Sequence, residues 1–285
     1  MGMSVFKQLS DWAIDMINEN RVEEAINELN SKISQGNAEA YGVLGAFYIY
    51  GVGVYPDINR GMDLLATSVN MGCGDAAYEL ANFYHGADNM INRDSQKEMF
   101  YLEKGAQLGN SKCCVPLSYN YLFGDGVPKD EYKGCHYAQI AAEDGYPDGM
   151  MNYGICFMEG LGTNKNPYEA AKWFRNALNY YPDDENAILN MVICLADPYE
   201  LYGIVPSQDM LQEAFYYCGK AVEKGNIEAH LICAWFYEEG KVVAQDFETA
   251  HKFTQIAADN GNEFAREHLK AFMKNIYGQY YIPNY

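Results

Sequence analysis

The 285-residue sequence predicts an all-α fold, a solenoid in which consecutive helix pairs stack on one another. Two observations predict it. Apolar segments end at glycines spaced by 36, 37, 36, 80 and 36 residues, namely Gly36, Gly72, Gly109, Gly145, Gly225 and Gly261. Two stretches of helical periodicity precede each repeat's end. A period of this length is typical of helical repeats. Because each repeat packs only on its neighbours, the chain can exceed the size of one compact core.

The first helix of each repeat is predicted from a pattern of small and large residues. A small residue is followed by an apolar residue four positions later, a second small residue at five and an aromatic residue at eight, as in Ala40, Leu44, Gly45 and Tyr48. Related patterns begin at Ala76, Cys113, Gly149, Ala187 and Ala229. Small residues at these places let two helices approach closely. Glycine-bearing turns at 51–54, 124–128 and 160–162 are predicted to connect this helix to the second helix of the repeat.

The second helix is predicted from two pairs of mostly apolar residues that follow a small residue. The first pair stands three and four positions after it, and the second pair seven and eight positions after it. The last repeat shows this as Ala250, Phe253-Thr254, Ala257-Ala258 and then Gly261. The spacing places these side chains on one face of a helix, and the closing glycine permits a left-handed helix end. The interval of 80 residues holds two longer repeats, with Tyr181 where a glycine is expected.

The recurring run A-x-x-x-L-G-x-x-Y, the turn G-x-G-V and a second helix closed by glycine resemble the Sel1-like repeat family, a relative of the tetratricopeptide repeat. The resemblance implies a right-handed α-α superhelix with six repeats over residues 37–262. Residues 1–36 resemble a tetratricopeptide-like helix pair. Residues 263–285 are predicted to form a capping helix and a tyrosine-rich tail, all in one continuous solenoid domain. The tail can fold back on the last helix or dock into a neighbouring molecule; folding back is the simpler expectation, because an array must cover its apolar end.

The charge of the chain is strongly negative. With 39 acidic and 20 basic residues the net charge is −19, which disfavours binding to nucleic acids and to anionic membranes. Two interpretations of the charge stay open: solubility alone, or attraction of a basic partner. The eight cysteines have irregular spacing and form no C-x-x-C pair, so we expect reduced thiols in the core. No signal-like or membrane-length apolar run is found, and a cytoplasmic protein is expected.

By resemblance to tetratricopeptide proteins, the first helix of each pair is expected to line a concave groove. Helical geometry selects the positions two before and two after the apolar residue of the pattern, and those five or six after it, as pointing away from the packed helices. The predicted partner-binding residues are Tyr50, Tyr78, Asn82, His85, Tyr119, Phe123, Met151, Ile155, Met158, Glu159, Trp235, Glu238 and Glu239. Exposed aromatic residues are typical of interaction sites. The alternative is that these residues are core in a tightly wound solenoid.

Motifs for catalysis and cofactors are absent from the sequence. It has no G-x-S-x-G elbow and neither a phosphate-binding G-x-x-x-x-G-K-[ST] loop nor an H-E-x-x-H pair. The neighbours Cys135 and His136 point about 100° apart on a helix and make a poor metal pair. His85 is either a partner-contacting histidine or an ordinary exposed one. We therefore predict no metal, no cofactor and no enzymatic activity.

The function expected from the repeats is that of a protein–protein interaction module, an adaptor that holds a partner protein or peptide in its groove. The partner would be an apolar helix or extended peptide with basic flanks opposite Glu159, Glu238 and Glu239. An alternative, implied by the same resemblance, is an immunity protein (antidote) that neutralises a basic bacterial toxin. A third, less favoured hypothesis is a hydrolase-type enzyme, for which the sequence offers no nucleophile and base.

Overall fold

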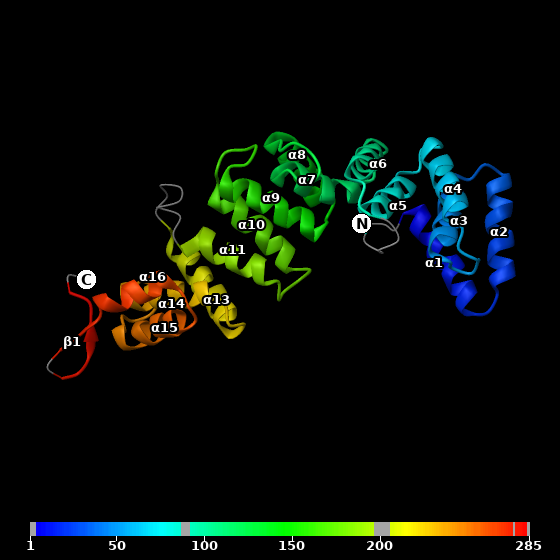
Figure 1. The fold of residues 1–285 in the computed structure, drawn as a ribbon. Coiled ribbons are helices and arrows are strands. Elements are labelled where there is room, and N and C mark those ends of the chain that lie inside the picture. Colours follow the sequence, from blue (N-terminus) through cyan, green and yellow to red (C-terminus); the bar gives the residue numbers. More distant parts are fainter. Residues whose placement is uncertain (1–3, 87–91, 197–205, 276, 284–285) are drawn as a thin grey trace. The chain divides into compact units, whose positions relative to one another are not determined.

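The computed structural model describes residues 4–86, 92–196, 206–275 and 277–283. Over these residues the regular secondary structure is almost entirely helical, and the predicted all-α solenoid with a C-terminal capping helix is confirmed (Figure 1). The structure divides into two compact units, residues 1–152 and 153–285. The domain boundaries predicted after residues 36 and 262 stay a prediction. No helix in the described ranges has the length and apolar character needed to cross a membrane.

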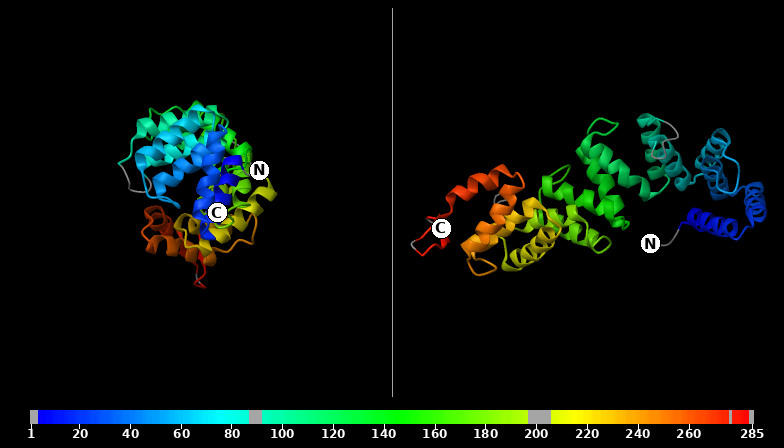
Figure 2. Two further views of the ribbon diagram at one scale, coloured as in Figure 1. Left: turned by 90° about the vertical axis from the view of Figure 1, so that its right-hand side faces the viewer. Right: turned by 60° about the horizontal axis from the view of Figure 1, so that its bottom comes forward.

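The first unit is a series of helix pairs, each packed on the next (Figure 2). Its elements are α1 (Val5–Asn18), α2 (Val22–Ser34), α3 (Ala38–Tyr50), α4 (Ile58–Asn70), α5 (Gly74–His85), α6 (Ser95–Gln107), the short 3-10 helix η1 (Ser111–Cys113), α7 (Cys114–Phe123) and α8 (Glu131–Glu143). The pairs α3 with α4, α5 with α6 and α7 with α8 make the most extensive contacts. The helix α9 (Pro147–Glu159) contains the boundary to the second unit.

The second unit continues the same pattern. Its elements are α10 (Pro167–Leu178), α11 (Glu185–Ala196), α13 (Gln208–Glu223), α14 (Ile227–Glu239), α15 (Phe247–Asp259), α16 (Glu263–His268), η2 (Leu269–Ala271) and the two short strands β1 (Met273–Lys274) and β2 (Tyr280–Tyr281). Extensive contacts join α10 with α11, α11 with α13 and α14 with α15. The two strands pair antiparallel.

The predicted glycine stops have the left-handed backbone that the sequence pattern requires. At Gly36, Gly72, Gly109, Gly145, Gly225 and Gly261 the φ angle is positive, between 78° and 100°. At Gly225, for example, no atom lies within 4 Å of the place where a Cβ would stand. The requirement there is therefore conformational, because an L-residue pays a steric cost in this region and glycine does not.

The small residues inside the helices serve close packing instead. A Cβ on Gly45 would lie 2.8 Å from the backbone oxygen of Gly61, and one on Gly154 would lie 2.5 Å from a ring carbon of Phe174. Both distances are shorter than real contacts allow, so these helices touch only because a side chain is missing. Buried alanines such as Ala138 and Ala214 take the same role elsewhere in the core.

All eight cysteines are buried thiols, which confirms their interpretation as small core residues. Burial raises the pKa of Cys73, and it raises the pKa of Cys114 to about 11. The thiols of Cys73 and Cys114 are therefore protonated and unreactive at neutral pH, since the nucleophile is the thiolate.

The C-terminal tail folds back on the last long helix. Tyr280 stacks on His251 of α15 with ring centroids 3.8 Å apart. Phe272 is buried, and the edge of one ring faces the other where it meets His251. The helical part of the cap ends at Ala271, because Phe272 adopts an extended backbone and turns its ring onto α15. Self-capping, the first of the two expectations for the tail, is the arrangement in the structure.

A candidate binding groove on the first unit

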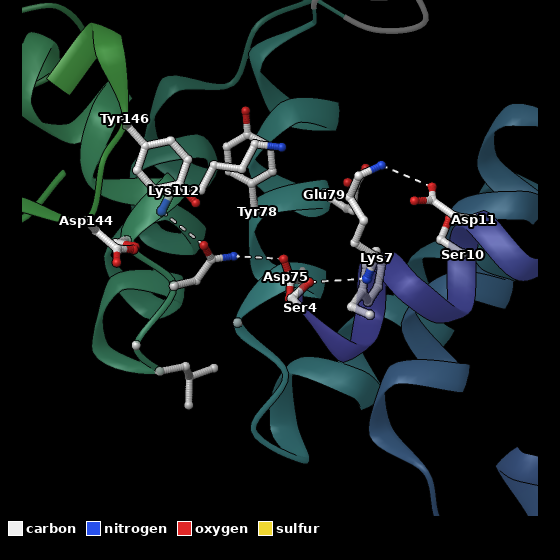
Figure 3. Close-up of a pocket in the computed structure, with 16 residues that line it drawn as sticks. Ser4, Lys7, Ser10, Asp11, Asp75, Tyr78, Glu79, Lys112, Asp144 and Tyr146 are labelled. Atoms are coloured by element: carbon white, nitrogen blue, oxygen red, sulfur yellow. Dashed lines mark hydrogen bonds and ion pairs between the residues drawn. The ribbon is translucent and has the colours of Figure 1, made fainter. Parts of the chain in front are cut away.

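Two cavities on the first unit meet at Tyr78 of α5, which lines both. The larger, of about 660 Å³, is walled mainly by charged and polar side chains, and we call it the polar cavity (Figure 3). The smaller, of about 480 Å³, has an apolar floor of Ala81, Leu102, Val115 and Pro116, and we call it the apolar cavity. The two together form the candidate groove.

The apolar cavity brings together four of the predicted partner-binding residues, Tyr78, Asn82 and His85 from α5 and Tyr119 from α7. Their spacing explains this. On α5 they follow one another by four and three positions, which is one face of a helix, and Tyr119 occupies on α7 the repeat position that Asn82 occupies on α5. Tyr119 is 50% exposed, so its ring is available to a partner.

An ion-pair network closes one side of the apolar cavity. The Glu98 carboxylate, only 3% exposed, lies 2.9 Å from His85 Nδ1 and 2.7 Å from Arg93 Nε. Arg93 also bonds Asp125 through Nη1 at 2.8 Å. The hydrogen bonds that Arg93 donates to Asp125 and Glu98 raise the pKa of Arg93 above its ordinary value. A buried carboxylate needs such partners because it has lost its hydration, so these groups hold the wall of the cavity in place.

Three asparagines supply hydrogen-bonding groups to the apolar cavity. Asn152 donates to the Ser118 hydroxyl at 2.7 Å. Asn120, 3% exposed, donates at 3.1 Å to the sulfur of Met99, a weak acceptor, and its Oδ1 accepts no hydrogen bond from any described residue. The Asn82 amide likewise has no partner in the described part of the chain. Both Asn82 and Asn120 can therefore bond a ligand without first breaking an internal bond.

The polar cavity is assembled from the starts of several helices. Lys7 and Asp11 of α1 form an ion pair of 3.0 Å on one side, near Glu79 of α5 (Figure 3). Asn110, before η1, donates to Asp75 at 3.3 Å. The turn before α9 contributes Asp144 and Tyr146, the former accepting a hydrogen bond from Ser111. Burial raises the pKa of Tyr146.

A lysine side chain covers the tyrosine at which the cavities meet. The Nζ atom of Lys112 lies 4.1 Å from the centroid of the Tyr78 ring, and Figure 3 shows Lys112 beside both Tyr78 and Tyr146. A cation over an aromatic face is attracted by the ring's quadrupole. This part of the groove thus already holds one positively charged group, and that group belongs to the protein itself.

The remaining predicted residues of the first unit lie outside both cavities. Phe123 is exposed, and the centroid of its ring lies 4.9 Å from that of Tyr119. It therefore extends the aromatic surface beside the apolar cavity. Tyr50 packs against the core of the unit, in line with the alternative that such positions are core. Met151 is half-buried on α9.

In the second unit the predicted residues are not gathered around either cavity. Ile155 and Met158 are half-buried on α9, and Glu159 is exposed. Trp235 on α14 is half-buried with Lys241 over its ring at 5.3 Å, and Glu239 forms an ion pair of 2.7 Å with the same lysine.

The structure corrects the placement of Glu238. It was expected on the exposed groove face, but its side chain is 2% exposed and lies 2.9 Å from His268 Nε2 on the capping helix. The physical reason is that α16 folds over this part of α14 and supplies the partner that a buried carboxylate requires. Glu238 is thus a structural residue of the C-terminal cap.

Glu98, Arg93, Asn120 and Asn152 were missed by the sequence reasoning. Asn120 has a sequence signal, because the same repeat position holds Phe47, Phe83 or Cys156 in other repeats. A polar residue in a series of core residues often marks a site with a special requirement. Among the described residues no cluster of three or more His, Cys, Asp or Glu is suited to hold a metal ion.

Comparison with known proteins places the repeats within one family. The family model described as Sel1 repeat matches residues 38–73, 74–110, 112–146, 147–179, 195–226 and 227–262. A curated relative, the chitin synthase regulator SKT5 of Saccharomyces cerevisiae, is 28% identical over 137 residues, which are 47% of this chain and 19% of that protein. The chain therefore spans about a fifth of this relative's length.

Two solved structures share the fold. A protective antigen of uropathogenic Escherichia coli with an SLR fold has a TM-score of 0.62 at 24% identity, over 87% of this chain and 51% of that one. A Sel1 repeat protein from Oxalobacter formigenes has a TM-score of 0.58 at 20% identity, over 87% of this chain and 96% of that one. At these identities the likeness concerns the fold alone.

Proposed function

The chain belongs to the Sel1 repeat family, and on that premise we propose that its first unit holds a segment of a partner protein in the groove formed by the polar and apolar cavities. Sel1 repeat proteins are protein-interaction modules, and the family is typically non-catalytic. The proposal makes this chain an adaptor or regulator whose own residues bind and position a partner and leave chemistry to other proteins.

The observation that carries the proposal is the apolar cavity. It joins Tyr78, Asn82 and Tyr119 above an apolar floor, which is the combination typical of recognition sites: aromatic and apolar area together with a few oriented polar groups. A chain segment that enters the cavity can bury apolar side chains and hydrogen-bond its backbone to Asn82. A rigid framework of packed helices keeps the cost of ordering the site low.

The relatives are consistent with a regulatory role. The yeast relative is named as a regulator of chitin synthase, and we extend to this chain only the general idea of a protein that acts on another protein. The antidote hypothesis differs in one respect, since it requires a single tight and exclusive partner. The same experiment addresses both.

The test is affinity capture of partners from the native lysate, with quantitative mass spectrometry. The wild-type protein is compared with the double variant Asn82→Ala/Tyr119→Ala and with Tyr132→Ala, a control on α8 that removes a 79% exposed tyrosine outside both cavities. A partner bound by the groove is retained by the control and lost by the double variant. Hot-spot residues contribute about 2 kcal/mol or more, so the affinity of the purified partner should fall at least about 30-fold.

The outcomes separate the hypotheses. Recovery of several proteins lost together in the double variant supports an adaptor, whereas one dominant basic toxin-like protein supports an antidote. Equal recovery with wild type and double variant contradicts a site in this groove.

A further inference from the structure

We infer that the segment bound in the groove is basic and extended, and that one of its Lys or Arg side chains takes the place over Tyr78 that Lys112 holds in the unbound protein. This inference rests on the proposed function and names the chemistry of the partner. It is carried by three independent features of the first unit: the charge of the groove, its unsatisfied hydrogen-bond acceptor and the lysine already in place.

The groove carries an excess of negative charge. Among the described residues, four carboxylates line the polar cavity, those of Asp11, Asp75, Glu79 and Asp144, and three line the apolar cavity, those of Glu98, Asp125 and Asp148. Of the described lining residues only Lys7 and Lys112 are lysine or arginine. Arg93 pairs with Glu98 and Asp125, and His85 lies against Glu98, so part of this negative charge is compensated. Clefts that concentrate one sign of charge attract the opposite sign, so a basic segment is favoured over a neutral or an acidic one.

The hydrogen-bonding groups of the apolar cavity also favour a basic segment. The Oδ1 atom of Asn120 has no donor among the described residues, yet it is not fully covered, because Trp173 Nε1 is the one fully buried side-chain nitrogen or oxygen among them that lacks a hydrogen-bond partner. A ligand that covers this oxygen must donate a hydrogen bond to it, since an acceptor that becomes buried without a donor is costly. Lys and Arg side chains are donors without acceptors, and the backbone of an extended peptide offers free N–H groups as well. An acidic ligand would bring further acceptors.

Lys112 indicates which kind of group the junction accepts. Its ammonium lies over Tyr78, the residue shared by the two cavities. Lys112 is an exposed residue, and no ion pair to a described carboxylate holds it there. A partner cation can therefore displace it, so that a Lys or Arg side chain of the partner lies over the Tyr78 ring in place of Lys112. The basic side chain would lie in the polar cavity and a neighbouring apolar side chain in the apolar cavity.

The chain contains a matched control for Lys112. Lys133 lies over the ring of Tyr121 at 5.0 Å in the same unit, but neither residue lines either cavity. Lys112→Ala and Lys133→Ala change the net charge equally and each removes one lysine from one tyrosine ring. A difference between the two variants in peptide binding therefore reports the groove and not the overall charge.

The test uses the full-length protein and three short fluorescent peptides read by anisotropy. The peptides share a backbone in which leucine alternates with a variable residue, which is lysine, serine or glutamate. We expect the lysine peptide to bind most tightly and the glutamate peptide least. We expect Lys112→Ala to tighten binding of the lysine peptide by about two- to fivefold, the equivalent of one cation–π contact of about 0.5–1 kcal/mol, and Lys133→Ala to have a smaller effect.

Two results would overturn the inference. If the serine peptide binds as tightly as the lysine peptide and both are lost with Asn82→Ala/Tyr119→Ala, the groove binds peptides and the basic preference is wrong. If Lys112→Ala and Lys133→Ala act equally, the exchange over Tyr78 is wrong. Binding of none of the three peptides also contradicts a basic segment, while the capture experiment decides separately on the groove itself. Circular dichroism of each variant checks that the helices are intact.

Discussion

His268 and Glu238 are joined by an ion pair in which the imidazole Nε2 lies 2.9 Å and 3.1 Å from the two carboxylate oxygens. The carboxylate is almost fully buried and the imidazole about one quarter exposed. The pair connects α14, the first helix of the last repeat, to α16, which covers the end of the stack. The cap is therefore attached by an interaction whose strength depends on the protonation of one side chain.

The first prediction concerns the pH dependence of this attachment. The hydrogen bond to Glu238 raises the pKa of His268 above its ordinary value of 6.5. Stability from such a group is fully present below the unfolded pKa and is lost as the pH rises through the folded pKa. The urea midpoint of the wild type relative to His268→Gln should therefore be higher at pH 5.5 than at pH 8.5. An unchanged difference between the two pH values would contradict the role of the pair.

His251 should show the opposite dependence. Burial beneath the C-terminal tail lowers the pKa of His251, so protonation as the pH falls below its ordinary pKa costs stability. Replacement by phenylalanine preserves a ring for Tyr280 to stack on, whose centroid is 3.8 Å away, and removes the titration. We expect the melting temperature of His251→Phe, measured by circular dichroism, to rise relative to that of the wild type as the pH is lowered from 7.5 to 5. A loss over the same interval would show that the imidazole is stabilised in its charged form.

Two glycines inside helices should respond to alanine in opposite directions. A Cβ on Gly154 would lie 2.5 Å from the Phe174 ring, and overpacking of a core typically costs about 1–3 kcal/mol. Gly219 of α13 is exposed, and nothing lies within 4 Å of its Cβ position. Gly219→Ala should therefore stabilise the helix by about 0.5–1 kcal/mol. Urea unfolding of the two variants measures both effects, and a neutral Gly154→Ala would contradict the close helix contact.

The network beside the apolar cavity predicts a rescue. Arg93→Ala leaves the buried Glu98 carboxylate with His85 alone, and loss of one partner of a buried ion pair costs up to about 3–5 kcal/mol; because Arg93 is 30% exposed, we expect the lower part of that range or less. Adding Glu98→Gln removes the uncompensated charge and should restore a large part of the stability. If the double variant is no more stable than Arg93→Ala, the cost has another origin, such as lost packing of the arginine side chain.

The sequence predicted those features that depend on local periodicity. The register of α5 and α7 follows from the spacing of small and apolar residues, so the sequence predicts Tyr78, Asn82 and Tyr119 on one surface, and all three line the apolar cavity. The glycine stops were predicted for a similar reason, since a left-handed residue at a helix end has a strong compositional preference.

Features that depend on distant contacts were not predictable in this way. Glu238 has the repeat position of a surface residue, and only the return of α16, thirty residues later in the chain, buries it against His268. Asn120 and Glu98 belong to the cavity because α5, α6 and α7 meet there, and no single helix shows that meeting. The partition into two units likewise arises from contacts between helices and has no local signal.

The buried thiols give the protein a set of internal reporters of local opening. They are distributed along the chain from Cys73 to Cys233, and because all of them are buried, a thiol reagent modifies each one only when its surroundings open. In a stack of repeats such openings occur in cooperative parts and not all at once. Timed alkylation followed by peptide mass spectrometry would thus give a separate opening rate for each stretch of the native chain, without an engineered label.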